Sequence, residues 1–234
     1  MKIENGYLII EPYEYIRNKK ITGHSFVDLL GLNNFKKPGD TLLTMHGFVA
    51  EKVDEKWLKR GDFAEKIVYL LYTQKYKKRC ITYDKQVIKW DNFQEKKNFG
   101  GLIDIELLDD KSLIEVKSKS LKDYEYICKN QPLNEVYQGE YYAFLRGYET
   151  FKMEWIFFDP ITEEEIFSGK KPTTLKNIRR FSKEYKVDFK EMEDKTKEAL
   201  TILENFRKER KIPLDQISEI NIEKLKESGK LYAK

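Results

Sequence analysis

The sequence has 234 residues, which is enough for one domain with a substantial core, whereas two full domains would be cramped. Hydrophobic residues make up 40% of it and charged residues 36%, so we expect a packed core under a highly charged surface rather than a disordered chain. Lysine and arginine exceed aspartate and glutamate by 44 to 40, an excess too small to indicate nucleic-acid binding by itself.

Cysteine usage and hydropathy argue against several further classes of protein. The two cysteines, Cys80 and Cys128, lie far apart without a metal-ligand spacing, which disfavours a structural zinc site and an iron–sulfur cluster. No apolar run approaches the roughly 18 residues that a membrane-spanning helix needs. Charges and Pro12 interrupt the N-terminal segment, so it does not resemble a targeting sequence. We therefore expect a cytoplasmic protein with two free thiols and no membrane partner.

The first elements expected along the chain are a short strand at residues 7–10 and a helix. The stretch ITGHSFVDLLGLNNF predicts that helix, with a cap at His24 or Ser25 and a stop at Gly31. The segment KKPGD at residues 36–40 is typical of a loop.

A longer helix and a weak strand are expected next. Residues 54–76 carry apolar side chains at helical spacing, and residues 81–90 alternate weakly, as in a strand. The members of the expected helical stripe are Trp57, Leu58, Gly61, Ala64, Ile67, Val68 and Leu71.

The second half of the chain begins with a predicted antiparallel hairpin. Two strand-like runs, LIDIELL and SLIEVKS, are separated by the polar turn at residues 109–111. A helix from about residue 134 to Gly147 and a strand at residues 151–160 follow, and a long amphipathic helix covers residues 188–210. The predicted fold class is α/β, with a small mixed sheet flanked by helices and a long C-terminal helix. We expect a single domain over 1–234, with its core at about 20–160 and a helical extension at 161–234.

Three charged residues of the predicted hairpin suggest a site. Alternation along a strand places Glu115 and Lys117 on one face, and the hairpin turn brings Asp104 near Glu115. Paired carboxylates with a backbone carbonyl suit Mg²⁺ or Mn²⁺, and a lysine beside them can position the water that attacks a phosphodiester. The same pattern also occurs by chance on the solvated face of an ordinary hairpin.

Residues elsewhere in the chain strengthen the interpretation as a site. Gln138 and Tyr142 lie four residues apart and therefore share one face of the expected helix. Glu65 lies within the earlier helix, next to its apolar stripe. The glutamine can hydrogen-bond a metal-bound water or the DNA backbone, while the tyrosine packs or stacks.

These motifs resemble the PD-(D/E)xK nuclease superfamily and, within it, the lambda-exonuclease/YqaJ group of phage recombination nucleases. The resemblance is carried by Asp104, the Glu-Val-Lys at 115–117, the glutamine–tyrosine motif at 138–142, the Gly-x-x-x-Glu at 61–65 and the segment at 21–31. It implies a restriction-endonuclease-like core over about residues 20–160.

The resemblance also implies roles for individual residues. Asp104 and Glu115 would bind the metal together with the carbonyl of Val116, and Glu65 would complete the metal shell or orient a water. Lys117 would position the nucleophilic water, Gln138 would support the site, and Tyr142 would pack beside it. The family's phosphate-contacting segment corresponds here to Thr22, His24 and Ser25.

The function expected from the resemblance is a Mg²⁺-dependent deoxyribonuclease, in particular a 5′ to 3′ exonuclease acting on linear duplex ends in phage-type recombination. The implied partners are DNA, a single-strand annealing protein and further copies of the chain in a homo-oligomer. For a phage-encoded protein the implied location is the cytoplasm of the bacterial host. Two alternatives stay open: a structure-specific or restriction-like endonuclease, and an inactive DNA-binding or assembly module with a nuclease fold.

Overall fold

The computed structural model describes residues 1–14, 19–50, 54–170, 172 and 177–231. The chain forms two compact units, and each has a β-sheet of its own. The first unit comprises Met1–Glu51, Gln94–Gly100 and Lys190–Lys234, and the second comprises Lys52–Phe93 and Gly101–Phe189.

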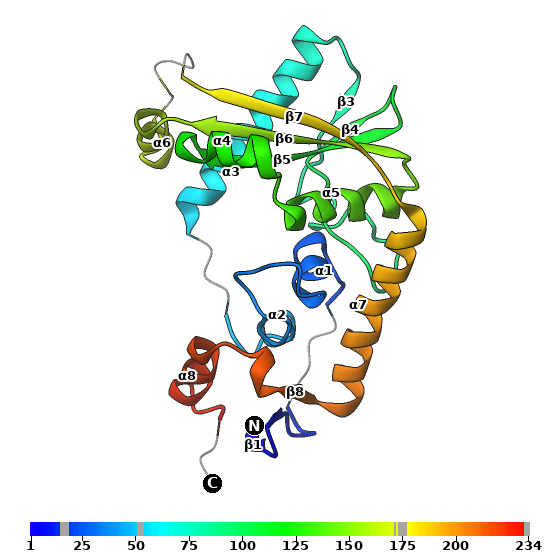
Figure 1. Cartoon of the computed structure of the whole chain (residues 1–234), viewed down its shortest axis with the longest axis vertical. Helices are drawn as coiled ribbons and strands as arrows, with labels where there is room; N and C mark the ends of the chain where they lie inside the picture. Colours follow the sequence, from blue (N-terminus) through cyan, green and yellow to red (C-terminus); the bar gives the residue numbers. More distant parts are fainter. Residues whose placement is uncertain (15–18, 51–53, 171, 173–176, 232–234) are drawn as a thin grey trace. The chain divides into compact units, whose positions relative to one another are not determined.

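The second unit is built on a mixed five-stranded sheet (Figure 1). All neighbouring strands are antiparallel except β5 and β6, which are parallel. Parallel strands need a crossover connection, and here α4 (Tyr124–Asn130) and α5 (Leu133–Arg146) form it. The strands lie in the order β3 (Cys80–Ile81), β4 (Ile105–Leu107), β5 (Ser112–Ser120), β6 (Thr150–Phe158) and β7 (Arg179–Lys186).

Helices cover both faces of this sheet. On one face, α3 (Glu55–Leu70), which a π-helical turn at Leu71–Lys75 extends, and α6 (Pro160–Phe167) contribute to the hydrophobic core. On the other face α5 packs on β6, where the indole of Trp155 donates a hydrogen bond of 2.7 Å to Glu135. The α/β class with a small, helix-flanked mixed sheet is therefore confirmed.

The first unit combines a small sheet with several helices. Its antiparallel strands lie in the order β1 (Lys2–Glu4), β2 (Tyr7–Ile9) and β8 (Lys211–Pro213). The segment at 94–100 joins this unit through a bridge between Ile21 and Phe99. Its helices are α1 (Gly23–Leu29), α2 (Pro38–Met45), nearly all of α7 (Phe189–Glu209) and α8 (Glu219–Glu227).

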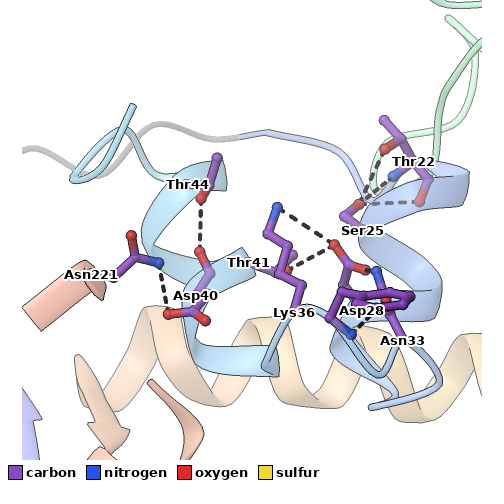
Figure 2. A network of polar contacts seen from close by, with 10 residues as sticks. Thr22, Ser25, Asp28, Asn33, Lys36, Asp40, Thr41, Thr44 and Asn221 are labelled. Carbon is purple, nitrogen blue, oxygen red and sulfur yellow. Dashed lines mark hydrogen bonds and ion pairs between the residues drawn. The ribbon is translucent and has the colours of Figure 1, made fainter. Parts of the chain in front are cut away.

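Two buried aspartates hold the helices of the first unit together (Figure 2). Asp28 of α1 and Asp40 of α2 are each only 4% exposed. Buried carboxylates are tolerated where donors satisfy them, and both have several. The donors to Asp28 are Asn33 at 2.8 Å, Thr41 at 3.1 Å and the ammonium of Lys36 at 3.5 Å, and those to Asp40 include Ser218 and Asn221.

Two expectations for the N-terminal half are wrong. The cap of α1 is Thr22 rather than His24 or Ser25, because the Ser25 hydroxyl reaches back to the Thr22 N–H at 2.7 Å. The predicted loop at 36–40 contains the start of α2, whose first residue is Pro38. Proline is favoured at a first helical position, since the amide hydrogen it lacks has no partner there.

Two further expectations, for residues 54–90, hold only in part. Of the predicted strand at 81–90 only Ile81 pairs, as the second residue of β3, because the Asp84 carboxylate accepts the N–H groups of the second and third residues after it and closes a turn. In α3 the expected stripe is buried at Ala64 and Val68, whereas Trp57 and Leu58 are exposed.

The structure also contains elements that the pattern did not predict. Asp159 caps α6 by accepting from two backbone N–H groups, so the proline predicted to stop β6 also begins a helix. The expected helical extension contains β7, an edge strand rich in charge that lacks alternation. The hairpin, α5, β6 and the long C-terminal helix are confirmed, and the unpredicted elements are α2, α4, α6, α8, β1, β7 and β8.

His46, which caps the C-terminus of α2, is a buried histidine that folding keeps neutral. Its Nδ1 lies 2.7 Å from the carbonyl oxygen of Leu42, so this nitrogen carries the hydrogen and donates it. The ring also lies 4.7 Å from that of Phe206. Burial, assisted by the positive charges of Arg207 and Lys19, lowers the pKa of His46 to about 4.

This histidine is expected to make the first unit sensitive to acid. The unfolded chain binds the proton of His46 near pH 6.5 and the folded chain only near pH 4. The stability that neutral His46 contributes is therefore fully present above pH 6.5 and is lost as the pH falls toward 4. The free energy of unfolding should lose roughly 3 kcal/mol from this group. In His46→Gln, which keeps a donor but does not titrate, the loss measured by urea unfolding at pH 7 and pH 4 should be smaller by that amount. Equal losses in both proteins would contradict the assignment.

Candidate active site

Asp104 and Glu115 meet across the β4–β5 hairpin. The register pairs Ile105 with Ile114, which places the residue before Ile105 opposite the one after Ile114. Asp104 directly precedes β4 rather than lying inside it, and its Oδ2 accepts the backbone N–H of Val116 at 2.8 Å. The aspartate is thereby fixed to the strand that carries the glutamate.

Glu115 is a buried carboxylate with one unsatisfied oxygen. The residue is only 2% exposed, and its Oε1 accepts from the Lys117 ammonium at 2.9 Å. Its Oε2 is buried and has no hydrogen-bond partner among the described residues. Burial and repulsion from Asp104 raise the pKa of Glu115 to about 8. An unsatisfied buried carboxylate oxygen is costly, so this position favours a cation.

Lys117 is held between β5 and α5. Its ammonium donates to Glu115 at 2.9 Å and to Oε1 of Gln138 at 2.7 Å. The glutamine can reach it because α5 lies close to β6 at Gly139, where an added Cβ would lie 2.9 Å from Met153. Burial opposes the charged form, but attraction to the carboxylates outweighs this and raises the pKa of Lys117. The ammonium therefore stays protonated at neutral pH.

Glu65 of α3 belongs to the same electrostatic cluster. Burial and repulsion from Asp104 raise the pKa of Glu65 to about 8. The Lys85 ammonium lies 3.8 Å from its Oε2 and 3.0 Å from Asp62. Sequence reasoning missed Lys85, because residues 81–90 were expected to form a strand.

Tyr142 supports the chain segment that leads to Asp104. It is 3% exposed, and its ring stacks on Phe93 with a centroid distance of 6.1 Å and an interplanar angle of 11°. A Cβ added to Gly101 would lie 2.6 Å from its Cε1, and Gly101 has a φ of +132°. Only glycine fits this position easily, so the tyrosine packs directly on the backbone three residues before the aspartate.

Asp91 and Asn92 fix the same segment from the other side, and the sequence patterns did not identify them. The side-chain oxygen of Asn92 accepts the N–H of Ile103 at 2.8 Å, and the backbone N–H of Asn92 donates to the Gly101 carbonyl at 2.8 Å. Asp91 accepts the N–H of Gly101 at 3.1 Å. Short polar side chains often bind nearby backbone, but the sequence does not reveal which backbone groups they bind.

The predicted phosphate-binding residues lie in the first unit, on and before α1. Figure 2 shows Thr22 and Ser25 bonded to each other, and the serine hydroxyl accepts from the Thr22 N–H and donates to its carbonyl at 3.1 Å. Ser25 is buried, whereas His24 is exposed. In this structure both Thr22 and Ser25 cap the helix, and their contact with a substrate phosphate stays a prediction.

The oxygen donors at the hairpin fit a small hard cation. In the part of the chain that the structure describes, no three histidine, cysteine, aspartate or glutamate side chains converge closely enough to form a complete metal site. Mg²⁺ commonly uses only one or two carboxylates and completes its octahedron with water. Asp104 and the unsatisfied Oε2 of Glu115 supply such a pair.

Comparisons with solved structures show that the fold is that of phage-type exonucleases. An alkaline exonuclease from Laribacter hongkongensis (LHK-Exo) matches with a TM-score of 0.55 and 14% identity over 91% of this chain and 94% of that one. A phage-related exonuclease from Haemophilus somnus matches with a TM-score of 0.55 and 14% identity over 81% and 94% of the two chains. LHK-Exo in complex with dAMP gives a TM-score of 0.57 and 13% identity over 81% and 89%.

The family itself follows from the sequence. A model described as the YqaJ-like viral recombinase domain matches residues 12–146, more than half of the chain, so the protein belongs to this family. An uncharacterized protein of Mycoplasma genitalium, MG373, is 28% identical over 137 residues, which cover 53% of this chain and 48% of that protein. The chain thus spans about half the length of this curated relative. The resemblance to lambda-exonuclease/YqaJ nucleases is confirmed. None of the described helices has the length and apolar character to cross a membrane.

Proposed function

We propose that the protein is a metal-dependent deoxyribonuclease that digests linear double-stranded DNA from its ends in the 5′ to 3′ direction. The observation that carries the proposal is the buried, unsatisfied Oε2 of Glu115 beside Asp104 and the Lys117 ammonium. Membership of the YqaJ-like family and the exonuclease fold support it. The LHK-Exo complex with dAMP shows that a protein of this fold binds a deoxyribonucleotide.

Mg²⁺ or Mn²⁺ would be held by Asp104, Glu115 and the Val116 carbonyl, with Glu65 completing the shell or orienting a water. When bound, the cation would neutralise the charge that develops on the phosphate. Lys117, whose ammonium is held by Glu115 and Gln138, would orient the attacking water and offset negative charge. Gln138 fixes the direction of this ammonium.

The proposal extends to the biological setting that the family indicates. It comprises phage-type recombination in the cytoplasm of a bacterial host, a single-strand annealing protein as partner, and a homo-oligomer. Thr22, His24 and Ser25 are proposed to contact a substrate phosphate.

Digestion of matched DNA substrates tests the function. Wild-type protein with Mg²⁺ is given covalently closed circular duplex, linear duplex with 5′-phosphate ends and linear duplex with 5′-hydroxyl ends, each with one labelled strand. We expect the circles to survive and the labelled strand of each linear substrate to shorten progressively from its 5′ end. Cutting of closed circles would favour the endonuclease alternative. A lack of cleavage with both Mg²⁺ and Mn²⁺ would favour the inactive DNA-binding module.

A further inference from the structure

The turn at residues 84–92 presents two large apolar side chains to solvent. Val87 is 76% exposed and Trp90 is 62% exposed. The turn is nonetheless ordered by its own hydrogen bonds, since Asp84 accepts from two N–H groups and the Trp90 N–H donates to the Lys85 carbonyl at 2.8 Å. The indole is therefore presented from a fixed backbone.

The backbone of this turn is strained where it carries the tryptophan. Lys89 has a φ of +50° and Trp90 a φ of +61°, and both lie in the left-handed region. A bulky residue there is an outlier, and such strain persists where the surrounding structure imposes it, which is common at functional sites. Glycine would adopt this conformation freely, so folding alone does not explain a tryptophan at this position.

Both ends of the turn are attached to the carboxylate cluster. At one end the Lys85 ammonium lies 3.8 Å from Glu65. At the other end Asn92 accepts the N–H of Ile103, the residue before Asp104. Trp90 thus lies on a segment that is attached at one end to Glu65 of α3 and at the other end to the backbone next to Asp104.

We propose that Trp90 stacks on an unpaired base of the DNA strand that enters the active site. The inference rests on the nuclease function proposed above, because it takes the carboxylate cluster as the place where the phosphodiester lies. Every base offers a flat face to an indole, so such a contact holds a strand without selecting its sequence. Lys89 beside it is exposed and adds a positive charge for the neighbouring backbone.

Binding measured in EDTA, where metal-dependent cleavage does not proceed, isolates this contact. The probes are six duplexes that each end in five single-stranded nucleotides. One, the fully based probe, carries all five bases, and each of the others lacks the base at a different one of the five positions. In wild type, one abasic position should weaken binding roughly tenfold. Trp90→Ala should bind the fully based probe roughly tenfold more weakly than wild type and show no further loss at that position.

Three further variants make the result specific. Trp90→Phe should keep most of the affinity, because it keeps an aromatic face. Trp90→Gly should lose affinity as Trp90→Ala does while its melting temperature stays equal or rises, since glycine relieves the positive φ. Tyr126→Ala removes a similarly exposed aromatic side chain from α4 and should bind like wild type.

The outcomes separate this inference from the proposed function. The stacking contact would be overturned, even if wild type digests DNA, by either of two results. One is that Trp90→Ala binds the fully based probe as tightly as wild type. The other is that, at every abasic position, the affinity losses from Trp90→Ala and from the missing base multiply. The stacking contact also fails if wild type does not bind the fully based probe. Binding with the expected pattern but no cleavage in Mg²⁺ or Mn²⁺ would overturn the nuclease function and leave the contact intact.

Discussion

Lys117→Ala is expected to lower the rate of DNA digestion by about 10³-fold, with little change in DNA affinity. The ammonium is the charged donor that Glu115 and Gln138 hold at the carboxylate pair. Because it is proposed to act on the water and on developing charge, its loss should appear in the single-turnover rate at saturating enzyme. Anisotropy with labelled linear duplex in EDTA measures affinity separately.

The matched control for this variant is Lys119→Ala. Lys119 lies two residues further along β5, on the same face, but pairs with Glu135 instead of Glu115. The control should keep its single-turnover rate within about tenfold of wild type. A loss of that size is allowed because the variant removes one positive charge near the substrate. Equal losses in the two variants would mean that general positive charge, rather than the position of Lys117, sustains the reaction. An active Lys117→Ala would remove the lysine from the mechanism.

The hairpin was predictable because its signal is local and periodic. Alternation over LIDIELL and SLIEVKS and a polar turn between them determine the pairing, so the approach of Asp104 to Glu115 follows from the strand register. The helix that carries Gln138 was equally clear, since it ends at Gly147 in a left-handed conformation. Where the site is built from periodic elements, its geometry could be inferred from the sequence.

The remaining parts of the site depend on turns and packing, which leave no periodic pattern. Lys85 and Asn92 act from a turn that hydrogen bonds between side chains and backbone define, whereas a weak alternation over residues 81–90, which include Lys85, indicated a strand. Asp28 and Asp40 are charged residues that composition places on the surface, yet both are buried because donors distant in sequence satisfy them. These contacts appear only when the chain is folded.

The edge strand β7 was also not predicted, because its sequence lacks a periodic pattern. It supports the sheet at the edge far from the β4–β5 hairpin. It pairs with β6 along its whole length, and its Arg180 binds the buried Glu154, which is 0% exposed. The guanidinium donates from Nε at 2.6 Å and from Nη2 at 2.5 Å, and the Tyr72 hydroxyl donates at 2.7 Å. Because Tyr72 follows α3, its hydrogen bond to Glu154 also ties the helix that carries Glu65 to the sheet.

Arg180→Met is therefore expected to lower the free energy of unfolding by about 3–5 kcal/mol, because it leaves Glu154 charged and buried without its cation. The double variant Arg180→Met with Glu154→Met should recover most of that loss, since two apolar side chains replace the pair. Arg179→Met, the adjacent exposed arginine whose nearest carboxylate lies 3.7 Å away on Glu125, should cost less than about 1 kcal/mol. Urea unfolding of the four proteins measures these differences. A double variant no more stable than Arg180→Met would show that the loss does not come from the unpaired carboxylate.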